Sequence, residues 1–460
     1  MLFNSLEFCL VFLPVALAGY WLARRSENAR IWFLIVASCA FYSYWDWRTT
    51  PLLIASTLLN WWASEAFRVR GNRAILVAAI AANLACLAAF KYLGFFADTF
   101  ASATGLAMTV PKLALPLGIS FFTFHHIIYL ADLLAERAPR YTLRDYALYI
   151  VLFPQILAGP LVRHSEIVHQ FRADPWAAGW PARWVEGWAL FAMGLVKKLF
   201  IADQLGAHSD LIFKQATEGP LPMIEAWSGA LAFTFQIYFD FSGYSDMAIG
   251  LALLFGFRLP VNFDAPYKAS SIADFWRRWH MTLSRFLRDY LYIPLGGSRY
   301  GMTTQVAALL ATMALGGLWH GAGWTFIVWG ALHGIALSVR VLWRAAAAPA
   351  VPAVAGWALT FLFVSVTWVF FRSADLGSAL RMISAMVGAG GADAAGAVPA
   401  ATWVMIAVGA AVVLAFPTSQ RIVQTMPHGR WTGAAIGLAL AAGLLKINNG
   451  PSHEFIYFQF

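Results

Sequence analysis

The sequence predicts an all-α fold, that of a polytopic membrane protein whose helices cross a bilayer many times. Hydrophobic residues make up 60% and charged residues only 12% of the 460 residues. Soluble domains average about 25% charged residues, so this chain has too little polar surface for several water-facing domains. Apolar runs near the length of a membrane-spanning helix, about 20 residues, recur along the chain. We therefore expect one integral-membrane domain over residues 1–460, surrounded by lipid.

The amino-terminal part contains regular apolar runs separated by charged connections. The expected spans there are residues 6–22, 31–44, 52–67, 74–90 and 113–134. Connections rich in arginine, such as residues 24–30 and 68–73, alternate with connections that carry little charge. Basic connections favour the cytoplasmic side of a membrane, which places the amino terminus on the opposite side. The net charge of +9 is explained first by this orientation, and binding of nucleic acid is not expected.

The middle of the chain interrupts its apolar runs with proline, glycine and polar residues. Residues 146–163 contain Pro154, Gln155 and Pro160. Non-helical backbone at membrane depth persists only where protein or a water-filled cavity satisfies it, so we expect a broken or re-entrant segment.

An apolar stretch over residues 226–257 carries Gln236, Asp240 and Asp246. Acidic residues inside a membrane are costly enough to face an interior path, which makes these three candidates to line a passage. Hydrogen bonding between neighbouring helices is an equally good explanation for any one of them.

Residues 268–299 form the most charged window, with six basic and two acidic residues. Within it, aromatic and leucine side chains recur at helical spacing and arginines occupy the other face, which predicts an amphipathic helix on the cytoplasmic membrane surface. The arginines in question are Arg277, Arg278, Arg285 and Arg288. They could anchor the helix to anionic lipid or attract a phosphate-bearing donor, and spacing alone leaves both open.

The last third returns to apolar spans. These are residues 306–318, 324–339, 357–371, 403–416 and 432–445. A stretch rich in glycine and alanine, residues 387–400, is expected to be a loop.

Three of the ten histidines stand out by context. His320 lies in GGLWHGAGW, with no formal charge from residue 302 to residue 339. Burial among apolar groups favours the neutral imidazole, which can accept a proton as a general base, and the flanking glycines allow close approach. A core histidine bonded to a neighbouring helix is the alternative. His280 lies at the edge of the apolar stripe of the amphipathic helix, and His333 is expected in the core.

Several chemistries have no sequence support. The chain contains no phosphate-binding loop, no Gly-x-Ser-x-Gly elbow and no His-Glu-x-x-His motif. Its cysteines, Cys9, Cys39 and Cys86, lack any disulfide or metal-ligand spacing. We therefore expect no metal site and no tightly bound cofactor.

Long strings of the sequence resemble one family. QIYFDFSGYSDMAIG, VNFDAPYKASSIADFWRRWHMTLSRFLRDYLYIPLGGSR and LGGLWHG are similar to motifs of the membrane-bound O-acyltransferase (MBOAT) superfamily, in its bacterial alginate O-acetylation branch. The resemblance extends to the opening FNSLEFCLVFLPV, to PLGISFFTFHHIIYLAD and to the closing FIYFQF. It implies a fold of about 11 transmembrane helices, with re-entrant and amphipathic helices around a central passage, and core motifs at about residues 226–343.

The resemblance also implies roles for residues. His320 of the Trp-His-Gly motif would be the principal catalytic residue and His280 the second functional polar position. Trp319 would line the passage with Gln236, Asp240 and Asp246. Arg277, Arg278 and Arg285 would hold the phosphates of the donor.

The function implied is membrane O-acetyl transfer. Acetyl would move from cytoplasmic acetyl-CoA across a bacterial inner membrane to an exported polysaccharide, alginate-like or cellulose-like. The amino terminus would then be periplasmic. Partners would be a periplasmic acetylesterase-like transferase and the polysaccharide synthesis complex. Acyl transfer to peptidoglycan, teichoic acid, lipid or protein, and a non-enzymatic transporter or flippase, are the alternatives.

Overall fold

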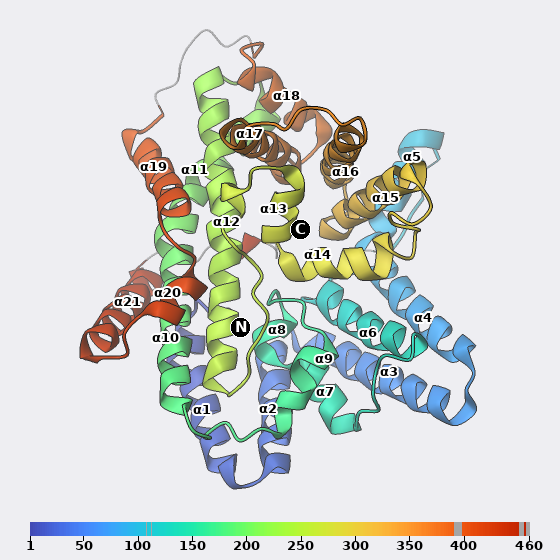
Figure 1. Cartoon of the computed structure of the whole chain (residues 1–460), viewed down its shortest axis with the longest axis vertical. Helices are drawn as coiled ribbons and strands as arrows, with labels where there is room; N and C mark the ends of the chain where they lie inside the picture. The colour runs from blue at the N-terminus through green and yellow to red at the C-terminus, as the bar shows by residue number, and fades with distance from the viewer. Residues whose placement is uncertain (107, 112, 391–397, 450–454, 457–460) are drawn as a thin grey trace. The chain divides into compact units, whose positions relative to one another are not determined.

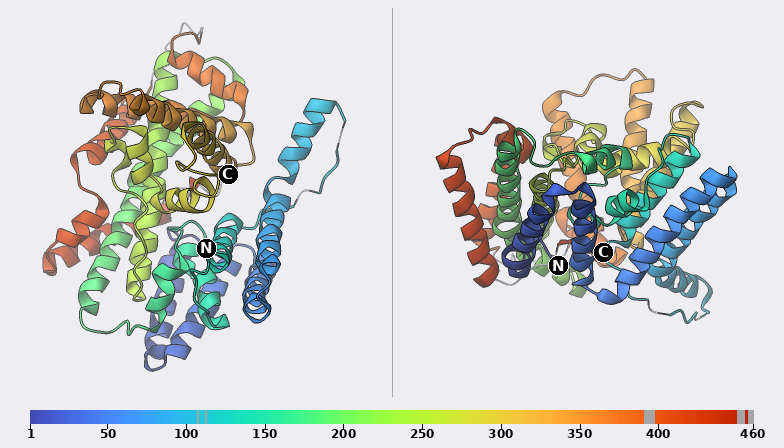
Figure 2. Two further views of the ribbon diagram at one scale, coloured as in Figure 1. Left: turned by 45° about the vertical axis from the view of Figure 1, so that its right-hand side comes forward. Right: turned by 90° about the horizontal axis from the view of Figure 1, so that it is seen from below.

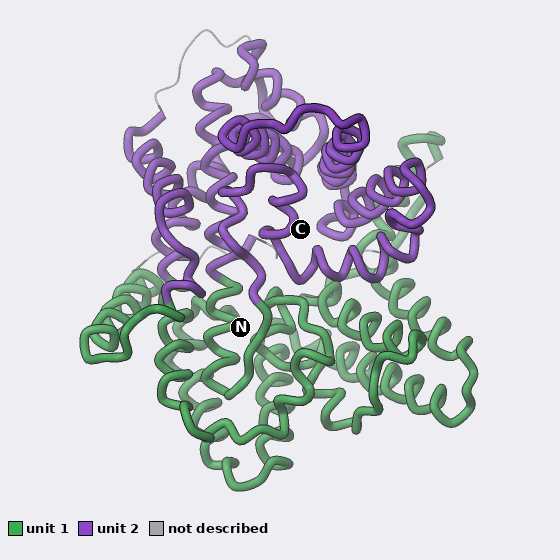
Figure 3. The backbone as a smooth tube through the Cα atoms, viewed as in Figure 1, with its two compact units in different colours: residues 1–195, 244–260, 423–452 green, residues 196–243, 261–422, 453–460 purple. Residues whose placement is uncertain are grey.

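The computed structural model describes residues 1–106, 108–111, 113–390, 398–449 and 455–456. These described residues form helices and connections and contain no strand, which confirms the all-α class (Figure 1). The chain divides into two compact units (Figure 3). Unit 1 holds residues 1–195, 244–260 and 423–452, and unit 2 holds residues 196–243, 261–422 and 453–460.

Unit 1 is built mainly from the amino-terminal helices. They are α1 (Leu13–Leu22), α2 (Glu27–Ser43), α3 (Thr50–Arg70), α4 (Arg73–Lys91), α5 (Leu93–Thr104), α6 (Ile119–Leu134), α7 (Leu143–Val151), α8 (Phe153–Ile156), α9 (His164–Ile167) and α10 (Trp180–Val196), with α21 (Arg430–Asn449) added from the carboxyl-terminal part. A π-helical turn, η1 (Glu7–Phe12), precedes α1, and 3-10 turns lie at η2 (Ala23–Arg25), η3 (Trp47–Thr49) and η4 (Val168–Arg172). Helix α4 packs against both α3 and α6 (Figure 2).

Unit 2 contains the helices that carry the catalytic candidates. They are α11 (Asp203–Glu218), α13 (Ile272–Arg278), α14 (Met281–Leu287), α15 (Met302–His320), α16 (Trp324–Ala345), α17 (Ala353–Arg372), α18 (Leu376–Met386) and α19 (Ala400–Ala415). The short elements η5 (Lys197–Ala202), η6 (Pro266–Lys268) and η7 (Arg288–Tyr292) belong to it as well. Helix α12 (Met223–Leu254) contributes residues to both units, and the boundary at residue 422 falls within α20 (Ser419–Thr425).

The α3–α4 hairpin shows how local sequence sets the helix ends. Gly71 ends α3 in the left-handed conformation, at φ 64°, where glycine carries no steric cost. Asn72 then caps α4 by accepting a hydrogen bond from the backbone N–H of Ala74. Within the hairpin the buried amides of Asn60 and Asn83 bond each other, at 2.6 and 3.2 Å. Buried polar groups on facing apolar helices are thus satisfied by one another.

Six helices of the described residues are long and apolar enough to cross a membrane, or seven if the bent pair α19 and α20 forms one span. The six candidates are Glu7–Arg25, Arg73–Lys91, Met302–His320, Trp324–Ala345, Ala353–Arg372 and Arg430–Asn449. The expected number of about 11 is therefore not confirmed. One reason is helix length, because α2 has 17 residues and α6, predicted from residue 113, begins only at Ile119.

The predicted break within residues 146–163 is confirmed as a feature of the backbone. Helix α7 ends at Val151, and the four-residue α8 starts with Pro154 in its first turn. The side chain of Ser38 accepts a hydrogen bond from the freed backbone N–H of Phe153, at 3.1 Å. The segment is buried in protein, which is the condition under which broken backbone is tolerated in an apolar setting.

Helices α15 and α16 form a hairpin whose backbones touch through glycine. Gly317 lies so close to α16 that an added Cβ would overlap the carbonyl oxygen of Phe326. Gly330 lies equally close to the carbonyl oxygen of Met313 on α15. Small residues at matching positions let apolar helices approach closely and gain van der Waals contact, which is the main force between helices in lipid. The hairpin therefore holds the end of α15 in a fixed position.

We predict that Gly317→Ala loosens this hairpin. The new methyl group must push α15 and α16 apart, and overpacking of this kind costs about 1–3 kcal/mol. The apparent melting temperature of the purified protein in detergent should fall. Gly437→Ala in α21 is the matched control, because a Cβ there meets no atom within 4 Å. An equal melting temperature for wild type and Gly317→Ala would contradict the packing argument.

Candidate active site

The amphipathic helix predicted within residues 268–299 is broken in the structure. Helix α13 ends at Arg278 and α14 begins at Met281, so the prediction of one continuous helix was wrong. His280 lies in the break, in the left-handed conformation at φ 43° and ψ 53°. A residue other than glycine held there costs about 1–3 kcal/mol and persists only when its surroundings impose it.

The segment around Asn262 imposes this conformation. The backbone N–H of Asp264 donates to the carbonyl of Arg278, and the N–H of Met281 donates to the carbonyl of Asn262, both at 2.9 Å. These two bonds are made by residues on either side of His280 in the sequence, and they keep the helix interrupted at that point. The prediction of a single helix failed because no local periodicity encodes this pairing with a distant segment.

Asn262 also fixes the tautomer of His280. The backbone N–H of Thr282, which can only donate, bonds Oδ1 of Asn262 at 3.3 Å, and the Thr282 hydroxyl bonds the same oxygen at 2.9 Å. Nδ1 of His280 lies 3.0 Å from that oxygen and must therefore be the donor. In the neutral ring the lone pair then resides on Nε2, so Nε2 is the basic nitrogen of this buried histidine.

His320 is the last residue of α15 and lies among aromatic rings. The centroid of its imidazole is 4.9 Å from Trp319, 5.2 Å from Trp329 and 5.2 Å from Phe371. Only 5% of His320 is exposed. Such a surrounding excludes water, and in a low dielectric each hydrogen bond or charge interaction of the imidazole is strengthened.

Trp319 joins the two histidines. Its ring lies 4.9 Å from the His320 ring and 6.5 Å from the His280 ring. The two motifs that the sequence singled out therefore meet in one cluster within unit 2. Phe241 of α12 covers the other side of His280 at 4.7 Å, and Phe455 near the chain end packs on Phe241 at 5.6 Å.

His333 is a core residue, as predicted. It is fully buried, and its Nδ1 accepts a hydrogen bond from the indole N–H of Trp276 at 3.2 Å. Its Nε2 therefore carries the proton and donates to the hydroxyl of Thr367 at 3.0 Å. Both ring nitrogens are used for packing α16 against its neighbours.

The passage candidates differ from one another. Asp240 is buried in an ion pair with Lys198, at 2.9 Å, and Lys198 also contacts Asp203 at 2.8 Å. The other carboxylate oxygen of Asp240 accepts the backbone N–H of Ile456, at 2.7 Å. Asp240 thus ties α12 to η5, to α11 and to the chain end. Helix-to-helix bonding, the alternative left open by the sequence, describes it well.

Gln236 is half-buried on α12, and its amide lies against Gly206 of α11. Asp246 is 1% exposed and belongs to unit 1, whereas Trp319 is buried in unit 2 beside the histidines. A passage lined by all four residues stays a prediction.

The arginines of the broken helix are accessible and partly neutralised. Arg277 is 68% exposed and contacts Asp274 at 3.3 Å. Arg278 is 33% exposed and contacts Asp274 at 3.1 Å and Asp264 at 3.9 Å. Arg285 is half-buried on α14. Asp274 is thus shared by both guanidinium groups and Arg278 also meets Asp264, so Arg277 is the more exposed of the two and the one more accessible to a ligand.

Sequence reasoning missed Asn262 and the aromatic residues Trp329 and Phe371. Asn262 lies 18 residues from His280, outside any helical period, although it stands inside a string that resembles the family. Trp329 and Phe371 looked like ordinary apolar residues of two separate spans. Only the packing of α15, α16 and α17 gathers them around His320.

Comparison with known proteins decides the family. A model of the membrane-bound O-acyltransferase family, MBOAT, matches residues 119–374, more than half of the chain. The chain belongs to this family. It is therefore a multi-pass membrane protein and an O-acyltransferase, and the resemblance inferred from its motifs is confirmed.

Curated relatives of this acyltransferase are named for transfer of an acyl group to peptidoglycan, alginate or teichoic acid. The peptidoglycan O-acetyltransferase of Helicobacter pylori is 41% identical over 427 residues, which cover 85% of this chain and 80% of the relative. A probable alginate O-acetylase of Pseudomonas putida is 38% identical and covers 100% of both chains. A teichoic acid D-alanyltransferase of Streptococcus thermophilus is 26% identical over 49% of this chain and 57% of its own length.

We predict that Asn262→Leu lowers acyltransferase activity about tenfold or more, because loss of the acceptor frees both the tautomer and the orientation of His280. Activity is measured as acyl transfer by the purified membrane protein. Asn448→Leu, at the exposed end of α21, is the control for a change from amide to apolar side chain. Full activity in a stably folded Asn262→Leu variant would show that the fixed tautomer is not required.

Proposed function

We propose that this acyltransferase moves acetyl groups from cytoplasmic acetyl-CoA to hydroxyl groups of an exported cell-surface polysaccharide. The names of the relatives support this substrate class, since alginate and peptidoglycan are both polymers outside the cytoplasm. The observation that carries the proposal is the pair of buried histidines whose rings both lie near the ring of Trp319. Two buried imidazoles in one cluster suit a reaction in which a proton leaves a hydroxyl and reaches the thiolate released from a thioester.

In the proposed step, the oxygen of the acceptor hydroxyl attacks the thioester carbonyl while His320 accepts the proton of that hydroxyl. The new C–O bond forms as the C–S bond breaks, and the proton passes to the departing CoA thiolate. His280 orients the acceptor, because its Nε2 holds the lone pair that accepts a hydrogen bond. In the alternative course, His320 holds the acetyl group as a short-lived acyl-imidazole before the hydroxyl receives it.

The membrane arrangement that goes with this chemistry has the chain in a bacterial inner membrane with a periplasmic amino terminus. A central passage would let the donor reach the histidines from the cytoplasm and the acceptor from the other side. About 11 spans, some shorter or bent, would enclose it. A periplasmic acetylesterase-like partner would complete transfer to the polymer together with the polysaccharide synthesis complex.

The acceptor itself is open among several envelope polymers. Relatives named for alginate and for peptidoglycan align over most of the chain, whereas a relative named for teichoic acid aligns over about half. Membership of an acyltransferase family favours chemistry over a non-enzymatic transporter or flippase. Supplying cells with labelled acetate and separating polysaccharide, peptidoglycan, lipid and protein would show which fraction receives the label.

We predict that His320→Ala abolishes acetyl transfer and that His280→Ala causes a large but smaller loss. General-base assistance contributes about a hundred- to ten-thousand-fold in rate, and a positioning group contributes less. The measurement is release of free CoA, and label in the acceptor, from labelled acetyl-CoA. His428→Ala, at an exposed connection, is the control. Normal transfer by a correctly inserted His320→Ala protein would refute the catalytic assignment.

A separate experiment distinguishes the two courses of the reaction. If hydroxylamine traps the label from the wild-type protein, the reaction passes through the acyl-imidazole.

We predict that Arg277→Gln raises the KM for acetyl-CoA about three- to tenfold and leaves kcat nearly unchanged. Arg277 is exposed and would attract the donor's phosphates without touching the reacting atoms. Steady-state kinetics at low ionic strength provide the measurement, and Arg430→Gln at the start of α21 is the control. If the KM stays the same, the arginine face serves as a lipid anchor instead.

A further inference from the structure

A second candidate site lies in unit 1. A pocket of about 610 Å³ opens there between the end of the first membrane-span candidate and the start of α10. It is lined by Trp21, Arg24, Asp174, Trp176, Trp180 and Trp184. Four indole rings, one guanidinium and one carboxylate in a single pocket form a composition that the acyl-transfer chemistry does not use.

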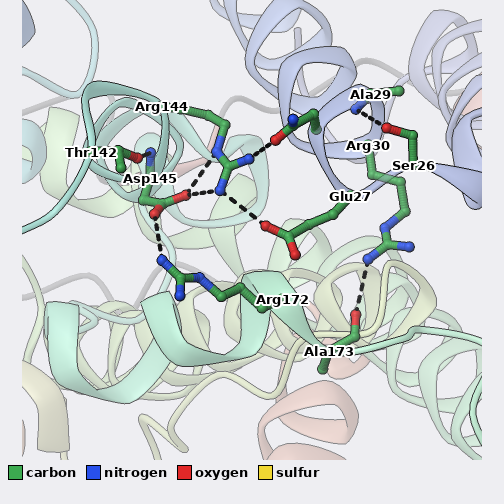
Figure 4. A network of polar contacts seen from close by, with 10 residues as sticks. Ser26, Glu27, Ala29, Arg30, Thr142, Arg144, Asp145, Arg172 and Ala173 are labelled. Atoms are coloured by element: carbon green, nitrogen blue, oxygen red, sulfur yellow. Dashed lines mark hydrogen bonds and ion pairs between the residues drawn. The ribbon is translucent and has the colours of Figure 1, made fainter.

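Buried Arg30 builds this pocket. Its guanidinium donates to the carbonyl of Arg24 at 3.1 Å and to the carbonyl of Ala173 at 3.2 Å. Arg30 therefore joins the η2 turn, which carries Arg24, to the segment after η4, which carries Asp174. Figure 4 shows Arg30 reaching Ala173 beside a charged network in which Arg144 contacts Glu27 and Asp145, both about 3 Å away.

The lining side chains are held in place individually. The guanidinium of Arg24 lies over the ring of Trp21, 4.2 Å from its centroid. The ring of Trp176 packs on buried Tyr20 at 5.4 Å. A carboxylate oxygen of Asp174 accepts the backbone N–H of Trp176 at 3.0 Å. Two charges of opposite sign thus line a pocket that also contains four indole rings.

The helix that borders the pocket indicates where the pocket lies in the membrane. Residues Glu7–Arg25 form a candidate membrane span, and Trp21 and Arg24 lie in its last turns. Trp21 and Trp180 are 48% and 37% exposed. Exposed tryptophan and arginine at the end of a span are typical of the layer where lipid headgroups meet water.

We propose that this pocket binds the headgroup of a zwitterionic phospholipid. The phosphate would contact Arg24, while the ammonium group would contact Asp174 and the faces of the tryptophan rings. Indole faces attract cations, and several of them together recognise ammonium groups. The volume suits a headgroup, since small-ligand pockets measure about 300–1,000 Å³.

The paired charges select this ligand over two others. An anionic lipid would satisfy Arg24 but would be repelled by Asp174. A sugar could stack on the tryptophans but would draw no benefit from the separated opposite charges. Ethanolamine and choline headgroups share the required chemistry of phosphate and ammonium, so both belong to the proposal.

The test measures lipid binding by native mass spectrometry of the delipidated full-length protein. Dioleoyl phosphatidylethanolamine, phosphatidylcholine and phosphatidylglycerol are titrated separately against wild type, Arg24→Gln and Asp174→Asn. Asn at 174 keeps an oxygen that can cap the turn, so the fold of the loop is preserved. The controls are Arg25→Gln, beside Arg24 but outside the lining, and Asp98→Asn on exposed α5.

We expect wild type to bind one ethanolamine or choline lipid at least about tenfold more tightly than phosphatidylglycerol. Asp174→Asn should remove this preference by weakening only the zwitterionic lipids, while Arg24→Gln should weaken all three. Tighter binding of ethanolamine lipids than of choline lipids would show that the ammonium group donates N–H hydrogen bonds to Asp174. Equal binding of the two would show that the ammonium group is held mainly by the indole faces. The proposal is overturned if phosphatidylglycerol binds as tightly as the zwitterionic lipids. It also fails if Asp174→Asn leaves their binding unchanged, or if a soluble oligosaccharide displaces them.

Discussion

The close contact of α15 with α16 is the constraint on which the candidate active site depends. Glycine at 317 and at 330 lets two helix backbones meet without side chains between them. His320 ends α15, and Trp329 and His333 lie on α16, so the hairpin sets the distances among them. Van der Waals contact between small residues is the force that lipid leaves available for this purpose.

A second constraint is that buried polar groups must find partners inside the protein. The oxygen of Asn262 receives three donors and thereby holds His280 in a strained conformation with a defined tautomer. Lys198 meets two carboxylates for the same reason. The first arrangement orients the imidazole of a candidate site and the second joins helices, although the sequence presents both as polar residues in apolar runs.

The candidate active site and the tryptophan pocket use aromatic rings differently. Around His320, the candidate catalytic residue, buried aromatic rings leave only 5% of the residue exposed. In the pocket of unit 1, half-exposed rings frame two opposite charges at the end of a membrane-span candidate. Burial makes the first setting suitable for proton transfer, and accessibility makes the second suitable for holding a headgroup.

The sequence by itself determined the membrane character, the helical class and the family, and it predicted His320 and His280 as the catalytic candidates. These follow from composition, apolar periodicity and short motifs, all of which are local properties of the chain. The tertiary structure decided that the helix breaks at His280, that Trp319 joins the two histidines and that Asp240 is held by Lys198 and Ile456. These contacts include pairs as far as 216 positions apart, and no periodicity records which distant group will satisfy a buried donor or acceptor.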